Sequence, residues 1–290
     1  MTELLGTPNP GGGPQAELWM GAHPGAPSEL LTGEGAVPLD KVLEQRGGRL
    51  PFLFKVLAAA RPLSIQVHPS LAQAQAGFDR EESEGIPRDA PHRTYRDRNH
   101  KPEVIAALTR FWALKGFRRS EGIAADLELL SADTDDALFR GLSEALAASP
   151  ALLLRRFLEL EPGERDFIAA RAIAVSGVEP DPGVPGSEER FTWIARMAGM
   201  FPGDPGVLAP LVLNTVELQP GQGLYQPAGE LHAYLEGTGI ELMANSDNVL
   251  RAGITSKHVD PDELFRVADL SARPVDVLVP EEADGGFRCY

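Results

Sequence analysis

The sequence predicts a mainly β protein with a helical insertion, on the strength of three observations. Short apolar runs alternate with Gly and Pro in residues 1–118 and again in residues 205–261. Between them, in residues 119–204, apolar residues recur at the spacing of a helix. The chain has 290 residues, of which 43% are hydrophobic, and this is enough to bury a sizeable core.

The first segment predicts short strands and loops. The runs "LPFLFKVLAA", "LSIQVHP" and "VIAALTRFWALKGF" are rich in the residues that strands favour and are separated by turn-forming residues. The stretch Ser83 to Asn99 is polar and interrupted by proline, so we expect a surface loop there.

The middle segment predicts helices. Leu138, Leu142 and Leu146 recur every four residues, and "SADTDD" before them resembles a capped helix start. The Gly- and Pro-rich stretch 177–189 predicts a flexible connector. Strand character returns in residues 210–246, where β-branched and aromatic residues alternate with turns.

Composition and charge exclude several classes of partner. A formal net charge of -15 argues against binding to nucleic acid phosphates or to an anionic membrane. Cys289 is the single cysteine, so no intrachain disulfide can form. No apolar run reaches the length of a membrane span, and the start lacks the pattern of an export signal. We therefore expect a cytoplasmic protein.

Two polar residues interrupt the strand-like run "LSIQVHPS". In an extended chain Gln66 and His68 project to the same face, while Ile65 and Val67 project to the other. Two polar groups would then point into one interior. A single histidine among apolar residues is more often a hydrogen-bonded structural residue than a metal ligand, so this pattern alone leaves both interpretations open.

A motif later in the chain bears on the choice between a structural histidine and a metal ligand. In "GQGLYQPAGELH", Gly221, Pro227, Gly229 and His232 have the spacing G, five residues, P, one residue, G, two residues, H. This resembles the second motif of the cupin jelly-roll β-barrels, in which Pro and Gly shape a tight turn and the following histidine enters the barrel.

Four longer blocks carry a closer resemblance. "ELWMGAHPGAPS", "FLFKVLAAARPLSIQVHPS", "YRDRNHKPEVIAAL" and "QPAGELHAYLEGTGIELMANSDNVLRAGITSKHVD" together resemble the type I mannose-6-phosphate isomerase family over residues 17–259. The resemblance implies one Zn²⁺ per chain, held by Gln66, His68, Glu103 and His232. Nitrogen and carboxylate ligands suit a catalytic zinc, and a neutral glutamine leaves the site about one positive charge by ligand counting.

The same resemblance implies a reaction and its residues. The family interconverts mannose 6-phosphate and fructose 6-phosphate by moving a proton through an enediol or enediolate. The resemblance implies an active-site role for Arg251, whose fixed charge suits holding oxyanion charge, although a surface arginine is the ordinary alternative.

The group that moves the proton stays open among three residues. A lysine desolvated beside zinc could have its pKa lowered enough to transfer protons, which makes Lys101 a candidate, and His100 is an equal one. Glu241 should face the interior if Ile240 and Leu242 pack outward, and it could be a base or a support for the site.

For the substrate phosphate, we expect Lys257 and Ser64 to bind an anion that the net charge would repel. Lys257 could equally be a solvated surface residue. The partner we expect is this small sugar phosphate, with no nucleic acid and no membrane, and the protein should be a monomer.

The resemblance also divides the chain. Residues 1–118 and 205–261 would form the catalytic cupin barrel, residues 119–204 the helical insertion, and residues 262–290 the start of a truncated C-terminal barrel. Truncation suggests an alternative function, a non-catalytic cupin that binds a metal or a sugar. A third class, iron-dependent cupin oxygenases, generally uses histidine-rich ligand sets, and Gln66 counts against it.

Overall fold

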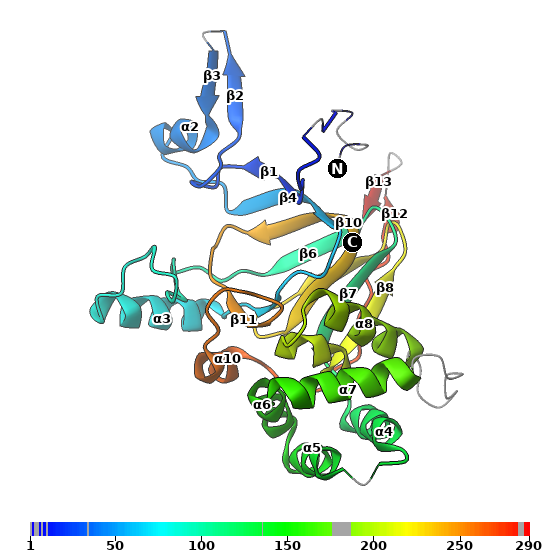
Figure 1. The fold of residues 1–290 in the computed structure, drawn as a ribbon. Helices are drawn as coiled ribbons and strands as arrows, with labels where there is room; N and C mark the ends of the chain where they lie inside the picture. The colour runs from blue at the N-terminus through cyan, green and yellow to red at the C-terminus, as the bar shows by residue number, and fades with distance from the viewer. Residues whose placement is uncertain are drawn as a thin grey trace.

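The computed structural model describes residues 11–33, 35–134, 136–175, 187–283 and 287–290, together with residues 2, 6, 8 and 9. Nine antiparallel strands in these residues are joined through one long central strand (Figure 1). These strands are β1 (Glu17–Gly21), β4 (Phe52–Ala59), β5 (Ile65–Val67), β6 (Glu103–Ala107), β7 (Phe111–Phe117), β8 (Leu213–Leu218), β9 (Gly223–Gln226), β10 (His232–Ala244) and β11 (Leu250–Gly253). Two separate hairpins are β2 (Glu29–Thr32) with β3 (Gly35–Pro38), and β12 (Glu281–Ala283) with β13 (Phe287–Cys289).

Strand β10 belongs to two layers of sheet. In the first layer, the second half of β10 pairs with β4 and β6, and the strand order is β1-β4-β10-β6-β9. In the second layer, the first half of β10 pairs with β5 and β7, and the strand order is β11-β5-β10-β7-β8. Gly237 lies where the two halves meet, with a φ of +130°, and a Cβ there would lie 2.7 Å from the Arg110 carbonyl oxygen. Only glycine fits this crossing. The pairings of the described strands do not close into a barrel.

The two layers enclose one core between them, and the second layer shares another core with the helices. Buried residues of β4, β6, β7, β8, β9 and β10 meet between the layers, and Ile105 and Phe111 are fully buried among them. On the other face of the second layer, Ile65 and Val67 pack with the helical segment. The predicted alternation is therefore confirmed, because Gln66 lies between these two residues and its side chain points to the inner face.

The helices of the middle segment gather against the second layer (Figure 1). They are α4 (Ser120–Ser131), α5 (Ala137–Ala148), α6 (Pro150–Glu159), α7 (Pro162–Val175) and α8 (Ser187–Met200), and a 3-10 turn η1 (Pro205–Leu208) and α9 (Ala209–Val212) lead back to β8. The Asp136 side chain accepts from the Leu138 N–H and caps α5, and Leu142 and Leu146 are buried. This confirms the predicted helical insertion. Of the predicted connector, residues 177–186 lie outside the described residues.

Other helices were not expected from the sequence pattern. Helix α2 (Leu39–Gln45) and helix α3 (Leu71–Ser83) lie in the segment predicted as strands and loops. Helix α3 begins with a capping box between Ser70 and Gln73, but the helix is polar and lacks a clear apolar stripe. Gly77 lets the Tyr95 ring pack against its backbone, since a Cβ there would lie 2.4 Å from that ring.

A further helix, α10 (Pro261–Val267), begins the segment for which a second barrel is predicted. The division of the chain into domains stays a prediction. No helix among the described residues is both long enough and apolar enough to cross a membrane.

Candidate metal centre and active site

Three potential metal ligands from distant parts of the sequence meet between the two layers. His68 follows β5, Glu103 begins β6 and His232 begins β10. All three are buried, and their ligand atoms lie within 4.8 Å of one another. Because β5 and the first half of β10, with His232, belong to one layer and β6 to the other, the site forms only when the layers face each other.

The backbone sets the orientation of both histidines. The Nδ1 atom of His68 lies 2.9 Å from the Asn248 carbonyl oxygen, and Nδ1 of His232 lies 3.0 Å from the Glu230 carbonyl oxygen. A carbonyl oxygen can only accept, so each Nδ1 carries the proton and each Nε2 keeps a lone pair. These Nε2 atoms lie 3.3 Å from the two carboxylate oxygens of Glu103.

The facing atoms are all acceptors. His68 Nε2, His232 Nε2 and Glu103 Oε2 are buried without a hydrogen-bond partner. Burial lowers the pKa of His68 to about 4, so this imidazole is neutral at neutral pH. Burial alone would raise the pKa of Glu103, but Lys101 and the two histidines hold it well below its usual range. Two imidazole lone pairs and a carboxylate fit a divalent cation, and this donor set suits zinc.

Gln66 lies beside this cluster. Its position is directly opposite His232 in the β5–β10 pairing and opposite Arg251 in the β5–β11 pairing. Opposed residues of antiparallel strands project to the same face, so the three side chains form a row on the inner face. This register supports Gln66 as a fourth ligand, a role that stays a prediction.

Lys101 is buried and its ammonium lies 3.0 Å from the Glu103 carboxylate. Burial by itself lowers the pKa of Lys101, but the charges of Glu103 and Glu241 outweigh it and raise the pKa above its ordinary value. The two carboxylates therefore oppose the desolvation from which a lowered pKa was expected. Without a cation, Lys101 acts as the counterion of Glu103.

Glu241 faces the interior, as the alternation in its strand predicted, and is 3% exposed. Its carboxylate lies 3.3 Å from the ammonium of Lys55, which is also buried. Burial and the charge of Glu103 raise the pKa of Glu241 to about 7. Lys55 is not among the residues predicted from the sequence. Its position between Leu53 and Leu57, two residues from each on an inward-facing strand, was the signal that could have found it.

A positively charged cavity adjoins the cluster. It has a volume of about 510 Å³, and Lys101, Arg251 and Lys257 line it together with Arg96, His92 and His258. Burial and the charge of Arg96 lower the pKa of Arg251, but a guanidinium stays charged. In a protein of net charge -15, this concentration of cations suits an anionic ligand.

Two predicted residues lie elsewhere. His100 is exposed and lines a neighbouring groove of about 580 Å³, with His23 and Asp247. Ser64 precedes β5 and is half-buried, and it lines neither that groove nor the positively charged cavity. The structure thus brings Lys101, Arg251 and Lys257 together, whereas His100 faces a separate surface.

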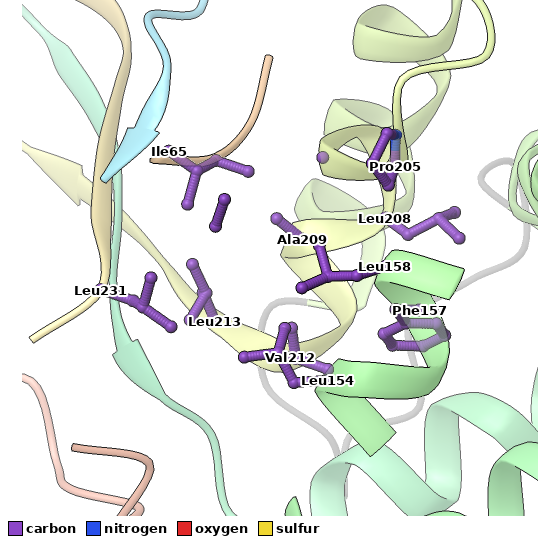
Figure 2. A pocket seen from close by; sticks show the side chains of 12 residues that line it. Ile65, Leu154, Phe157, Leu158, Pro205, Leu208, Ala209, Val212, Leu213 and Leu231 are labelled. Carbon is purple, nitrogen blue, oxygen red and sulfur yellow. The ribbon is translucent and has the colours of Figure 1, made fainter. Parts of the chain in front are cut away.

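A further pocket lies between the second layer and the helices (Figure 2). Its side chains, among them Ile65, Leu154 and Phe157, are apolar, and its volume is about 20 Å³. A space that small and apolar is a packing gap in the core, and it cannot hold a sugar phosphate.

Known proteins of one family resemble this chain over most of its length. A model of the phosphomannose isomerase type I catalytic domain matches residues 1–120. Mannose-6-phosphate isomerase of Escherichia coli strain K12 is 40% identical over 299 residues, which cover 99% of this chain and 74% of that protein. The chain belongs to the mannose-6-phosphate isomerase family.

Solved structures of mannose-6-phosphate isomerases share the fold. A zinc-bound structure matches with a TM-score of 0.84 at 37% identity, covering 97% of this chain and 74% of that one. The enzyme from Salmonella typhimurium, solved with fructose 6-phosphate and zinc, matches with a TM-score of 0.83 at 36% identity, covering 98% of this chain and 74% of that one. The resemblance and the predicted cupin fold class are confirmed.

Proposed function

We propose that this protein is a zinc-dependent isomerase that interconverts mannose 6-phosphate and fructose 6-phosphate. The observation that carries the proposal is the buried cluster of His68, Glu103 and His232, whose acceptor atoms face one another beside a positively charged cavity. Supporting it, a mannose-6-phosphate isomerase of similar fold was solved with fructose 6-phosphate and zinc.

The metal would be held by Gln66, His68, Glu103 and His232, one Zn²⁺ per chain. Zinc supplies Lewis acidity toward the sugar oxygens at the reacting carbons. The neutral side chain of Gln66 matters, because Glu103 is then the only anionic ligand and the centre keeps positive charge.

Arg251 is suited to hold the negative charge that develops on the substrate. Its guanidinium lines the cavity and lies in the strand beside Gln66. A fixed positive charge stabilises an enediolate more than the neutral sugar, and this difference accelerates the reaction.

The proton that leaves C2 of the open-chain aldose must be held and then delivered to C1. Glu241 is one candidate, because a carboxyl group whose pKa is raised to about 7 can both take up and release a proton, but it is buried against Lys55 and could equally support the site. Lys101 is buried against Glu103, and His100 lies in the neighbouring groove. Both remain alternatives for assisting ring opening or proton transfer.

The phosphate would bind at the outer part of the cavity. Lys257 lies there with His258 and Arg96, and Lys257 is exposed enough to reach a ligand. An ammonium and a guanidinium are strong phosphate donors. Ser64, the other predicted phosphate contact, has no position in this cavity to support it.

No described feature favours the non-catalytic alternative, and Gln66 argues against an iron-dependent oxygenase, because such sites generally use histidine-rich ligand sets. A coupled assay of fructose 6-phosphate formed from mannose 6-phosphate tests the proposal. The protein should contain zinc, lose turnover on chelation and regain it when zinc is added. Full turnover after complete removal of the metal would exclude the proposed mechanism. The monomeric state stays a prediction, and gel filtration tests it.

A further inference from the structure

A second buried polar cluster lies beside the proposed metal ligands. It consists of Lys115, Gln226 and Glu230, and Lys115 is 6% exposed and Gln226 is 0% exposed. The strand register aligns it with the metal centre, since Lys115 stands opposite His232 in the β7–β10 pairing and Gln226 stands opposite Glu103 in the β6–β9 pairing. Each residue thus projects to the same face as its opposed ligand.

The ammonium of Lys115 holds this cluster together. It donates to the Tyr225 carbonyl oxygen at 2.7 Å and to Gln226 Oε1 at 3.5 Å, and it forms an ion pair with Glu230. Lys115 carries only donors, so it fixes the oxygen of the Gln226 amide on its own side. The amide nitrogen is then directed away from Lys115.

That nitrogen has no partner. Gln226 Nε2 is buried without a hydrogen bond, and so is Oε2 of Glu103 at the opposed position. One atom is a donor and the other an acceptor. A buried unpaired amide is costly, and native structures keep few of them without a functional reason.

Glu230 links the same cluster to the other ligand. Its carboxylate pairs with Lys115, while its backbone carbonyl accepts from Nδ1 of His232. Gly116 makes room for this side chain, because a Cβ there would lie 2.7 Å from Glu230 Oε1. The cluster therefore contacts the surroundings of both Glu103 and His232.

We propose that Gln226 is a positioning residue for the metal centre: when Glu103 binds the cation, the unpaired amide N–H of Gln226, oriented by Lys115, forms a hydrogen bond to the Glu103 carboxylate and fixes the orientation in which Glu103 faces the cation. Glu230 completes the arrangement by anchoring both Lys115 and His232. The inference rests on the proposed function, since it assumes that Glu103 and His232 bind zinc. It adds a second partner for Glu103 besides Lys101.

Zinc affinity tests this proposal without relying on turnover. In Gln226→Leu the amide is replaced by an apolar group of similar size. We expect the zinc dissociation constant, measured by competition with a chromophoric chelator, to rise about 10- to 100-fold, the usual effect of losing a partner of a metal ligand. Thr215→Val is the matched control. It removes a different buried polar atom without a partner, the Thr215 hydroxyl on β8 opposite Leu114, and should change the affinity less than about twofold.

The melting temperature of the metal-free protein distinguishes a positioning role of Gln226 from a packing role. Since Gln226 Nε2 is unpaired, Gln226→Leu should leave the melting temperature of the metal-free protein equal to or above that of the wild type. The visible spectrum of the Co²⁺-loaded variant should differ from that of the Co²⁺-loaded wild type, because the orientation of a ligand changes.

Lys115→Met provides a second, independent variant. It keeps Gln226 but removes the group that orients its amide, so zinc affinity should fall by less than in Gln226→Leu. In the double variant the two losses should not add, since both act through one hydrogen bond.

The negative results distinguish a failure of the proposed function from a failure of this inference. If the wild type binds no zinc, this inference falls together with the proposed function. If the wild type binds zinc and Gln226→Leu binds it equally well, only this inference is overturned. A melting temperature of the metal-free variant that drops along with its zinc affinity would also overturn it, because Gln226 would then be a structural residue.

Discussion

Gln66 lies directly opposite His232 where β5 pairs with β10. Two proposed metal ligands, one a neutral amide and one an imidazole, thus share one cross-strand position on the inner face. Gln66→Glu keeps the size of the side chain but adds a negative charge beside the proposed cation. We expect zinc to stay bound while kcat falls roughly 10- to 100-fold, since less positive charge is left for the enediolate.

Metal analysis and the isomerase assay check this prediction. Gln219→Glu, an exposed glutamine in the turn after β8, is the matched control and should leave kcat unchanged. A Gln66→Glu variant with full kcat and full zinc content would show that the neutral ligand is not needed for the reaction.

Arg251→Ala should lower kcat about 100- to 1,000-fold and leave the zinc content unchanged. Its guanidinium lines the cavity but is not among the proposed ligands. The measurement is kcat together with zinc content. Arg110→Ala, at an exposed ion pair with Glu217, should change neither quantity. Loss of zinc from Arg251→Ala would instead assign Arg251 a role in holding the metal centre.

Lys257→Ala should raise KM for mannose 6-phosphate about tenfold and change kcat less than about twofold, because a phosphate contact is made equally in the ground and transition states. Lys41→Ala, an exposed lysine in the neighbouring groove, is the control. Steady-state kinetics at several salt concentrations measure both constants. An unchanged KM for Lys257→Ala would support its interpretation as a solvated surface residue.

Glu263 should make the free energy of unfolding sensitive to acid. It accepts from the Tyr95 hydroxyl at 2.6 Å and pairs with Arg80 at 3.1 Å. Burial raises its pKa, but the contacts from Tyr95 and Arg80 outweigh burial and lower it from 4.5. A carboxyl with a lowered pKa in the folded protein stabilises it above its unfolded pKa, and this contribution is lost as the pH falls through the folded value.

Urea unfolding from pH 7 to pH 3 measures this effect. The stability difference between the wild type and Glu263→Gln should be largest near pH 7 and should shrink below pH 4.5. Asp79→Asn removes an ion pair between exposed side chains and should change stability little at any pH. A difference for Glu263→Gln that is constant with pH would contradict the prediction.

The proposed metal ligands differ in how far the sequence alone predicts them. Gln66 and His68 follow from alternation along one strand, since neighbouring positions of a strand have a fixed geometry. Their meeting with Glu103 and His232 does not follow from spacing, because it depends on which strands pair. Only the resemblance to a family supplied those two ligands, and the structure then placed His68, Glu103 and His232 together.

The surroundings of the site were harder to predict. Lys55 was overlooked because a lysine in an apolar strand gives no sign of its partner, and its partner Glu241 is far along the chain. Likewise, a net charge of -15 gives no indication that several cationic side chains line one cavity, because it does not say where charges lie in the fold. Helix α3 was missed because its capping signal was not accompanied by an apolar periodicity.

The central position of β10 has a consequence for how this protein is made. β4, β5, β6 and β7 leave the ribosome well before β10, with the whole helical segment between them. Until β10 is synthesised, these strands lack the neighbour that joins them, and folding depends on contacts between residues far apart in the chain. His232 lies in that same strand, so the complete set of proposed ligands is available to bind a metal ion only after β10 has been synthesised and has paired with its neighbours.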